Sequence, residues 1–184
     1  MRKALLAVAL VMALAIGAEA GSIYLVPSAM TVAVGATFTI DVVVSGAESP
    51  GAESCNVEVY FDPSKVNALG AGEGGFMAQQ NPESYMAFGY LVDNTAGVLS
   101  YTFTRLGPKV STGSGTAAVL TFECKSAGLT IMDYFAVVSD PEGGDLLSAT
   151  GEVEVQQGVV PEPMTLVLVG AAVTALGVVA RKRS

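Results

Sequence analysis

A short run near the C-terminal end gathers carboxylates on a glycine-containing turn, a composition that suits calcium. The run is Asp140-Pro141-Glu142-Gly143-Gly144-Asp145, and calcium in proteins takes about six or more oxygen ligands. Its spacing is not that of the EF-hand loop, in which ligands recur at alternate positions. We therefore interpret the run as an acidic surface turn, and we predict no metal site.

One residue type on which many catalytic sites depend is missing. The chain contains no histidine, which removes Ser–His and Cys–His nucleophile pairs and most catalytic zinc sites. Paired carboxylates can cleave glycosides without histidine, yet none here sits in an apolar, aromatic-rich context, and the chain has no tryptophan. The glycine-rich run at 69–75 lacks the lysine of a phosphate-binding loop. We predict a non-catalytic protein that needs no cofactor.

The charge balance excludes a nucleic-acid partner. The formal net charge is -8, whereas nucleic-acid binding needs a basic patch that displaces counterions. Residues 21–158 hold fifteen acids, the total of 17 without Glu19 and Glu162. The bases in the same stretch are Lys65, Arg105, Lys109 and Lys125.

The N-terminus has the three parts of a secretory signal peptide. Met1-Arg2-Lys3 is a basic start, residues 4–16 form an apolar run, and Ala18 and Ala20 make a small-x-small cleavage site. We predict that residues 1–20 are removed after Ala20 and that the protein leaves the cytoplasm. An uncleaved N-terminal anchor is the alternative.

The C-terminus, residues 159–184, has its own three-part pattern. Pro161-Glu162-Pro163 precedes an apolar stretch over residues 164–180, and Arg181-Lys182-Arg183 follows it. A stretch of this length is at the lower limit for a transmembrane helix, and the terminal bases favour the cytoplasmic side. The prolines cannot donate backbone hydrogen bonds, so they separate the helix from what precedes it.

This tail resembles the PEP-CTERM sorting signal in order, spacing and terminal position. The resemblance implies recognition by an exosortase, with cleavage near Pro161-Glu162-Pro163. It also implies a place in the cell envelope or outside the cell, with anchoring in the inner membrane before release. A permanent single-span anchor is the alternative and gives the same topology.

Apolar and polar residues alternate between the two ends, as in half-buried strands. Turn residues such as Gly35, Asp62-Pro63 and Gly128 separate the alternating runs, which predicts an all-β two-sheet sandwich of eight or nine strands. We predict loops at 45–54 and 69–83. The inward members of the runs are Phe38, Ile40, Val42 and Val44; Cys55, Val57, Val59 and Phe61; Leu99, Tyr101 and Phe103; and Ala118, Leu120, Phe122 and Cys124.

The same region resembles a cohesin domain. The resemblance is carried by Val34-Gly35 with 38–44, by 56–66 with its Phe61-Asp62-Pro63 turn, and by 115–123 followed by Gly128. It implies a nine-stranded jelly-roll sandwich over 21–158, an architecture shared with a group of carbohydrate-binding modules. It also implies binding of a dockerin-like protein.

Cys55 and Cys124 are the only cysteines, and in an exported protein a pair of cysteines favours a disulfide. The cohesin resemblance implies that their strands are antiparallel neighbours, which would bring the two thiols side by side. Two buried thiols that act as small apolar side chains are the alternative.

The outward row of the Cys55 strand is the candidate partner-binding face, because the cohesin resemblance places dockerin contacts on that sheet. It implies a polar pair at Ser54 and Asn56, although an acid is frequent at the second position. The residues predicted for the face are Ser54, Asn56, Glu58 and Tyr60, with Thr121 and Glu123 on the neighbouring strand. An ordinary solvated sheet face is the alternative.

Two functions follow from these patterns. The first is an extracellular protein–protein interaction module; the second is a carbohydrate-binding or structural component of a secreted exopolysaccharide matrix. Sugar binding on a flat surface needs exposed aromatic rings, for which Tyr60, Tyr85 and Tyr90 are the candidates.

Overall fold

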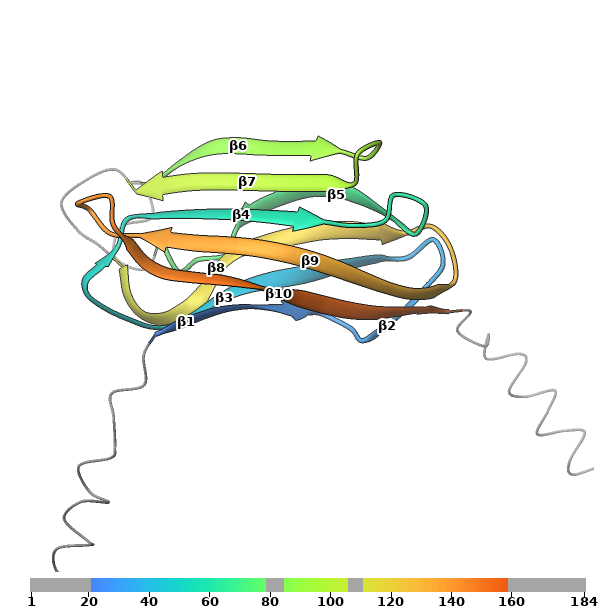
Figure 1. Ribbon diagram of the computed structural model, residues 1–184, viewed down its shortest axis with the longest axis horizontal. Helices are drawn as coiled ribbons and strands as arrows, with labels where there is room; N and C mark the ends of the chain where they lie inside the picture. Colours follow the sequence, from blue (N-terminus) through green and yellow to red (C-terminus); the bar gives the residue numbers. More distant parts are fainter. Residues whose placement is uncertain (1–20, 79–84, 106–110, 159–184) are drawn as a thin grey trace, which may run out of the picture.

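The computed structural model describes residues 21–78, 85–105 and 111–158, which form ten strands and no helix (Figure 1). The prediction of an all-β sandwich is confirmed, with ten strands in place of nine. The strands are β1 (Ser22–Pro27), β2 (Thr31–Ala33), β3 (Thr37–Ala52), β4 (Ser54–Tyr60), β5 (Val66–Glu73), β6 (Tyr85–Asp93), β7 (Val98–Arg105), β8 (Ser111–Cys124), β9 (Gly128–Ser139) and β10 (Asp145–Gly158).

Two sheets lie face to face. The four-stranded sheet has the order β1-β3-β8-β5, and the six-stranded sheet has the order β2-β10-β9-β4-β7-β6. The short β2 runs parallel to β10, while the other pairs of neighbours are antiparallel. In Figure 1 the long strands of both sheets run along the length of the molecule.

The alternating runs pack their predicted inward sides into one core. Ile40 and Val42 of β3 and Val57 and Val59 of β4 are fully buried. Phe122 stacks on Phe38 and meets the edge of Phe61, each with ring centroids 5.7 Å apart. Because strand side chains alternate between faces, one inward row per strand is enough to fill the space between the sheets.

The predicted loop at 45–54 is almost entirely strand, and the first five residues of the predicted loop at 69–83 are strand as well. β3 continues to Ala52 through register shifts against β8, and β5 extends to Glu73. These stretches consist largely of small and acidic residues, so apolar and polar residues do not alternate along them. Their backbones nevertheless pair with β8. Glycines with positive φ, such as Gly46 and Gly51, allow the irregular backbone.

The Phe61-Asp62-Pro63 turn closes one end of the sandwich. Hydrogen bonds from the Ser64 side chain and from the Ser64 backbone, the latter 2.8 Å long, lower the pKa of Asp62. Lys125 Nζ donates to the Pro63 carbonyl at 2.6 Å. A Cβ at Gly97 would lie 2.0 Å from the Phe61 carbonyl oxygen, so only glycine fits beside this turn.

A buried arginine holds three segments together at the other end. Arg105 is 2% exposed, and its Nη1 donates to the Met77 carbonyl at 2.9 Å and to Ser111 Oγ at 2.7 Å. These two acceptors replace water at Nη1, while Nη2 is buried without a hydrogen-bond partner among the described residues. Arg105 therefore ties the end of β7 to the start of β8 and to the segment after β5.

Both predicted targeting segments, 1–20 and 159–184, lie outside the described residues. The described part of the chain includes no helix with the length and hydropathy that a membrane span requires. The transmembrane helix predicted at 164–180 stays a prediction.

Candidate partner-binding face

β4 presents a polar row on the outer face of the six-stranded sheet. Its other row, which includes Cys55 and Val57, is buried in the core. Ser54, Asn56 and Glu58 are half-buried, and Tyr60 is 46% exposed. The predicted outward positions on this strand are therefore confirmed.

Hydrogen bonds order the row. Tyr60 Oη donates to Glu58 Oε2 at 2.8 Å, and this bond to a carboxylate raises the pKa of Tyr60. Thr102 Oγ1, on β7, donates to Asn56 Oδ1 at 2.8 Å. Because these side chains are already held in place, they would lose less conformational entropy when a partner binds.

The neighbouring strands complete the face with apolar side chains. Glu58 pairs with Phe135 of β9 on one side and with Ser100 of β7 on the other. Ser100 in turn pairs with Leu91 of β6. Phe135 is 39% exposed, and Leu91 is also exposed. Glu58 thus lies between two large exposed apolar side chains, Phe135 on β9 and Leu91 on β6.

β9 carries further exposed apolar side chains beside Phe135, and the sequence patterns did not reveal them. Leu129, Ile131 and Phe135 point outward, whereas Met132 and Ala136 are buried. Because both faces of this strand carry apolar residues, no alternation of polarity marks it. An apolar run between Gly128 and the Asp140 turn is the signal that would have found it.

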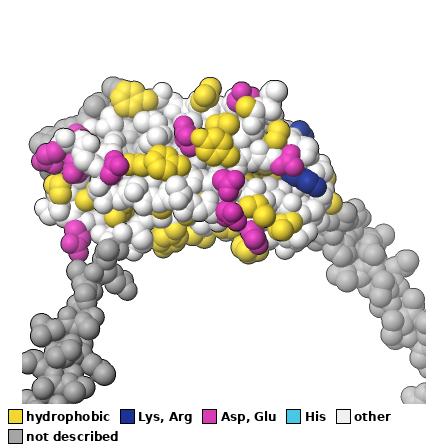
Figure 2. All heavy atoms as spheres, in the orientation of Figure 1, with side chains coloured by type: hydrophobic (Ala, Val, Ile, Leu, Met, Phe, Trp, Pro, Cys, Tyr) yellow, Lys and Arg dark blue, Asp and Glu magenta, His cyan; other side chains and the backbone are white. Residues whose placement is uncertain are grey.

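The outer face of the six-stranded sheet carries acids but few bases. Glu58, Asp133, Glu152 and Glu154 lie on it, and Asp133 pairs directly with Glu152 across β9 and β10. Figure 2 shows acidic and apolar side chains interspersed on the visible face, with the basic ones gathered at one end. Like charges facing each other destabilise a sheet slightly.

A shallow hollow opens among these acids. Its volume is about 420 Å³, and its lining includes Tyr60, Asp133, Phe135 and Glu152. The hollow combines aromatic rings with two carboxylates. A cationic side chain of a partner would find both charge complementarity and a ring face there.

Thr121 and Glu123 do not belong to this face, and their prediction was wrong in this respect. β8 pairs with β3 and β5 in the four-stranded sheet, not with β4. Thr121 lies opposite Thr39, and Glu123 opposite Thr37. Both are therefore on the opposite outer face of the sandwich. Their alternation was predicted correctly, but the neighbours of their strand were not.

The predicted Cys55–Cys124 disulfide is absent, and both thiols are free and buried. The cysteines lie in different sheets, because β4 pairs with β7 and β9. They also lie at opposite ends: Ala52, just before Cys55, pairs with Ser111 at the far end of β8 from Cys124. β8 has 14 residues, on the order of 45 Å at ~3.3 Å per residue. The two side chains fill core space as small apolar groups.

The Asp140–Asp145 run forms the turn between β9 and β10. Asp140 Oδ1 accepts a hydrogen bond from the Gly144 backbone at 2.7 Å, and the Asp140 and Gly144 backbones are bonded at 2.9 Å. In the described ranges no cluster of three or more potential metal-binding side chains occurs.

The remaining predicted site residues lie outside the described part of the chain and stay predictions. They are the cleavage-site residues Ala18 and Ala20 and the sorting-signal runs Pro161-Glu162-Pro163 and Arg181-Lys182-Arg183.

Comparison with protein families matches residues 24–158 to the cohesin domain. No curated protein matches the chain. A chain in the structure of a type II cohesin–X–dockerin complex from Acetivibrio cellulolyticus is 13% identical to this chain. The match has a TM-score of 0.63 and covers 75% of this chain and 99% of that one. The cohesin module of a family 33 glycoside hydrolase from Clostridium perfringens is 14% identical, with a TM-score of 0.57 over 76% and 98%. A type I cohesin–dockerin complex from Clostridium thermocellum is 15% identical, with a TM-score of 0.58 over 74% and 99%.

Proposed function

Because the chain belongs to the cohesin domain family, we propose that it is a non-catalytic module that binds a dockerin-like protein outside the cell. The binding surface is the outer face of the six-stranded sheet, centred on Asn56, Glu58 and Tyr60 of β4. The observation that carries the proposal is the ordered polar row of β4 between the exposed apolar side chains of β9 and β6.

The composition of this face specifies what the partner must offer. Exposed aromatic side chains such as Tyr60 and Phe135 provide contact area with little entropy loss, as in the energetic centres of many interfaces. The acids Glu58, Asp133 and Glu152 call for bases on the partner. We infer a partner surface that combines apolar side chains with lysine or arginine.

The known complexes support the type of partner. The Acetivibrio cellulolyticus and Clostridium thermocellum structures are complexes of a cohesin with a dockerin. This chain has the family's domain over residues 24–158. A dockerin-like module is therefore the first partner class to test.

Export and sorting complete the proposal. The pattern of residues 1–20 supports secretion, and Pro161-Glu162-Pro163 with its apolar and basic continuation supports processing by an exosortase. In this arrangement the sandwich faces the outside while the tail holds it in the inner membrane or is released from it. The tail thus determines where the sandwich, and any partner bound to it, is located.

The test is capture of dockerin-bearing proteins by the immobilised full chain. The extracellular fraction of the source organism is passed over it with calcium and again with a chelator, because dockerins fold around calcium. We expect a dockerin-bearing protein to be retained and then lost on chelation. Retention of polysaccharide alone, or of no protein, would contradict the proposal.

A further inference from the structure

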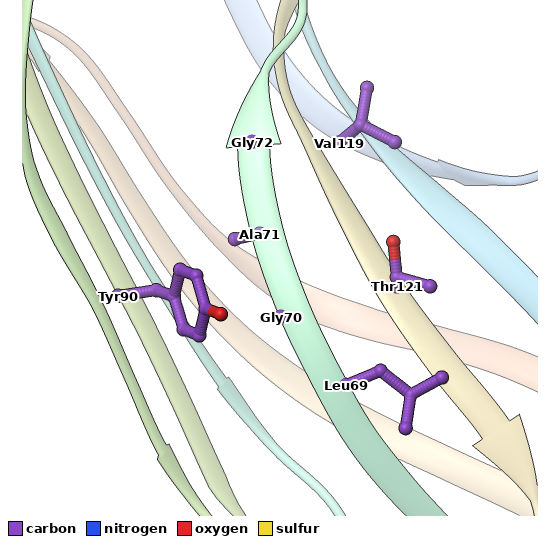
Figure 3. Close-up of a pocket in the computed structure, with 7 residues that line it drawn as sticks. All are labelled: Leu69, Gly70, Ala71, Gly72, Tyr90, Val119 and Thr121. Carbon is purple, nitrogen blue, oxygen red and sulfur yellow. The ribbon is translucent and has the colours of Figure 1, made fainter.

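A second hollow lies away from the partner-binding face, where the free edges of the two sheets come together. β5 is the last strand of the four-stranded sheet, and β6 is the last strand of the six-stranded sheet. The hollow has a volume of about 420 Å³ and is lined by residues of β5, β6 and β8. We refer to it as the edge trough (Figure 3).

The floor of the edge trough is low where β5 has two glycines, Gly70 and Gly72, while Leu69 and Ala71 supply the side chains of this strand that line the trough. On β5, Gly70 pairs with Thr121 of β8, and Gly72 pairs with Val119. The missing side chains leave a lowered strip between Thr121 and Val119 on one side and Tyr90 on the other (Figure 3). A ligand in the trough would therefore lie across β5.

The wall contributed by Tyr90 depends on a bulge. β6 shifts register between Ala87 and Gly89, so that Tyr90 pairs with the buried Tyr101. Because β6 is an edge strand, the Tyr90 ring extends over β5 and remains 54% exposed. Bulges re-aim side chains in this way and are enriched beside functional sites.

Gly70 positions the ring. A Cβ at Gly70 would lie 3.1 Å from Tyr90 Cζ and 3.3 Å from its hydroxyl oxygen, so a side chain would push the ring away. Gly70 also has a φ of 153° and follows a second bulge, between Ala68 and Gly70. The two facing edges are thus both deformed at the point where Tyr90 meets β5.

The chemistry of the trough selects a neutral ligand with hydroxyl groups. None of its lining residues carries a charge, although the chain as a whole has a net charge of -8. Tyr90 offers a ring face for the C–H groups of a sugar, and the Tyr90 and Thr121 hydroxyls are donors and acceptors for its hydroxyl groups. The volume is within the range of about 300–1,000 Å³ typical of ligand sites.

We propose that the edge trough is a binding site for a neutral saccharide unit, with Tyr90 as its stacking platform and Gly70 as the positioning residue. An added peptide strand is the competing occupant of a free sheet edge, but the bulges in β5 and β6 interrupt the row of hydrogen-bonding groups that it would need. The site goes beyond the proposed function: one protein would hold a protein on its sheet face and a glycan at its edge.

Affinity electrophoresis tests this proposal. The full chain, kept in solution with a detergent that has no sugar headgroup, is run through gels containing hydroxyethylcellulose, dextran, galactomannan or anionic alginate. We expect retardation by at least one neutral polysaccharide. The Tyr90→Ala variant should bind about tenfold more weakly, the order expected for loss of an aromatic stacking partner.

Matched variants separate the trough from the rest of the surface. Tyr60→Ala removes a comparably exposed tyrosine from the partner-binding face and should leave retardation unchanged. Gly70→Ala keeps the ring but displaces it and should weaken binding, while Tyr90→Phe should retain most of it; thermal melting of each variant checks folding. The proposal is overturned if no neutral polysaccharide retards the protein, if alginate is preferred, or if folded Tyr90→Ala behaves as wild type.

Discussion

The two outer faces of the sandwich are built by the same alternation, yet they differ in chemistry. The six-stranded face combines acids such as Glu58 and Asp133 with exposed apolar side chains such as Phe135. The four-stranded face has a row of threonines, with Thr39 opposite Thr121 and Thr37 opposite Glu123. Among the described residues, the first face alone brings large apolar groups together with a directly paired set of acids.

The topology of the strands decides which residues form one surface. Alternation determines that Glu58 and Thr121 both point outward, but hydrogen-bond pairing determines that they point in opposite directions from the core. A residue acquires its role from the strands beside it. If the two faces are independent, a substitution on one of them should leave the other unaffected.

Cys55 lies behind the six-stranded face and Cys124 behind the four-stranded face. The burial of Cys55 gives the largest expected effect. Burial raises the pKa of the Cys55 thiol from 9.0 to about 12, so at pH 8 about one Cys55 in ten thousand is a reactive thiolate, against roughly one in ten without this shift. We expect alkylation of native Cys55 to be about a thousandfold slower than after unfolding, as followed by mass spectrometry. Cys124, whose pKa burial also raises, ends β8 beside an exposed turn and should react first.

The mass of the untreated protein provides the control. It should be identical before and after reduction, because both thiols are free. A mass lower by about two daltons before reduction would mean that the two sheets are covalently joined. The separate positions of Cys55 and Cys124 would then be wrong.

Much of the fold could be predicted because the information was local. The inward rows of β3, β4, β7 and β8 follow from period-two alternation, and each is buried. The partners of each strand could not be predicted in this way, because they depend on hydrogen bonds between distant segments. The assignment of Thr121 and Glu123 to the β4 face failed for this reason.

The candidate site was predicted only in part, because only part of it is encoded within a single strand. The row Ser54, Asn56, Glu58 and Tyr60 belongs to one strand, so alternation was sufficient to find it. The contributions of β9 and β6 come from strands whose polarity does not alternate. The edge trough depends on bulges at Gly70 and Gly89, and a glycine in a strand only suggests that a bulge is present.

Each face has an exposed aromatic side chain that can be removed. Phe135 is 39% exposed on the six-stranded face, and Tyr24 is 42% exposed on the four-stranded face. Phe135→Ala should weaken binding of the captured dockerin-bearing protein about 30-fold or more, as expected for an aromatic residue at the centre of an interface. Tyr24→Ala should change it by no more than about twofold, since β1 is in the other sheet.

Isothermal titration calorimetry on both variants makes the comparison, with thermal melting to exclude unfolding. Equal losses would indicate that binding depends on the overall fold and not on one face. A larger loss for Tyr24→Ala would move the interface to the four-stranded sheet.

The smallest expected effect concerns the acids, and it separates their position from their number. Asp133 and Glu152 face each other on the six-stranded face, so the double variant Asp133→Asn/Glu152→Gln removes both repulsion and attraction for a basic partner. We expect a slightly higher melting temperature and an association rate about three- to tenfold lower at low salt, since complementary charges act mainly on association. The matched variant Asp41→Asn/Glu123→Gln removes the same charge from the four-stranded face, where Asp41 and Glu123 lie opposite other residues. If the four-stranded-face variant slows association in stopped-flow measurements as much as the six-stranded-face variant does, the net charge of the protein attracts the partner. If it does not, the acids on the six-stranded face attract the partner because of their position.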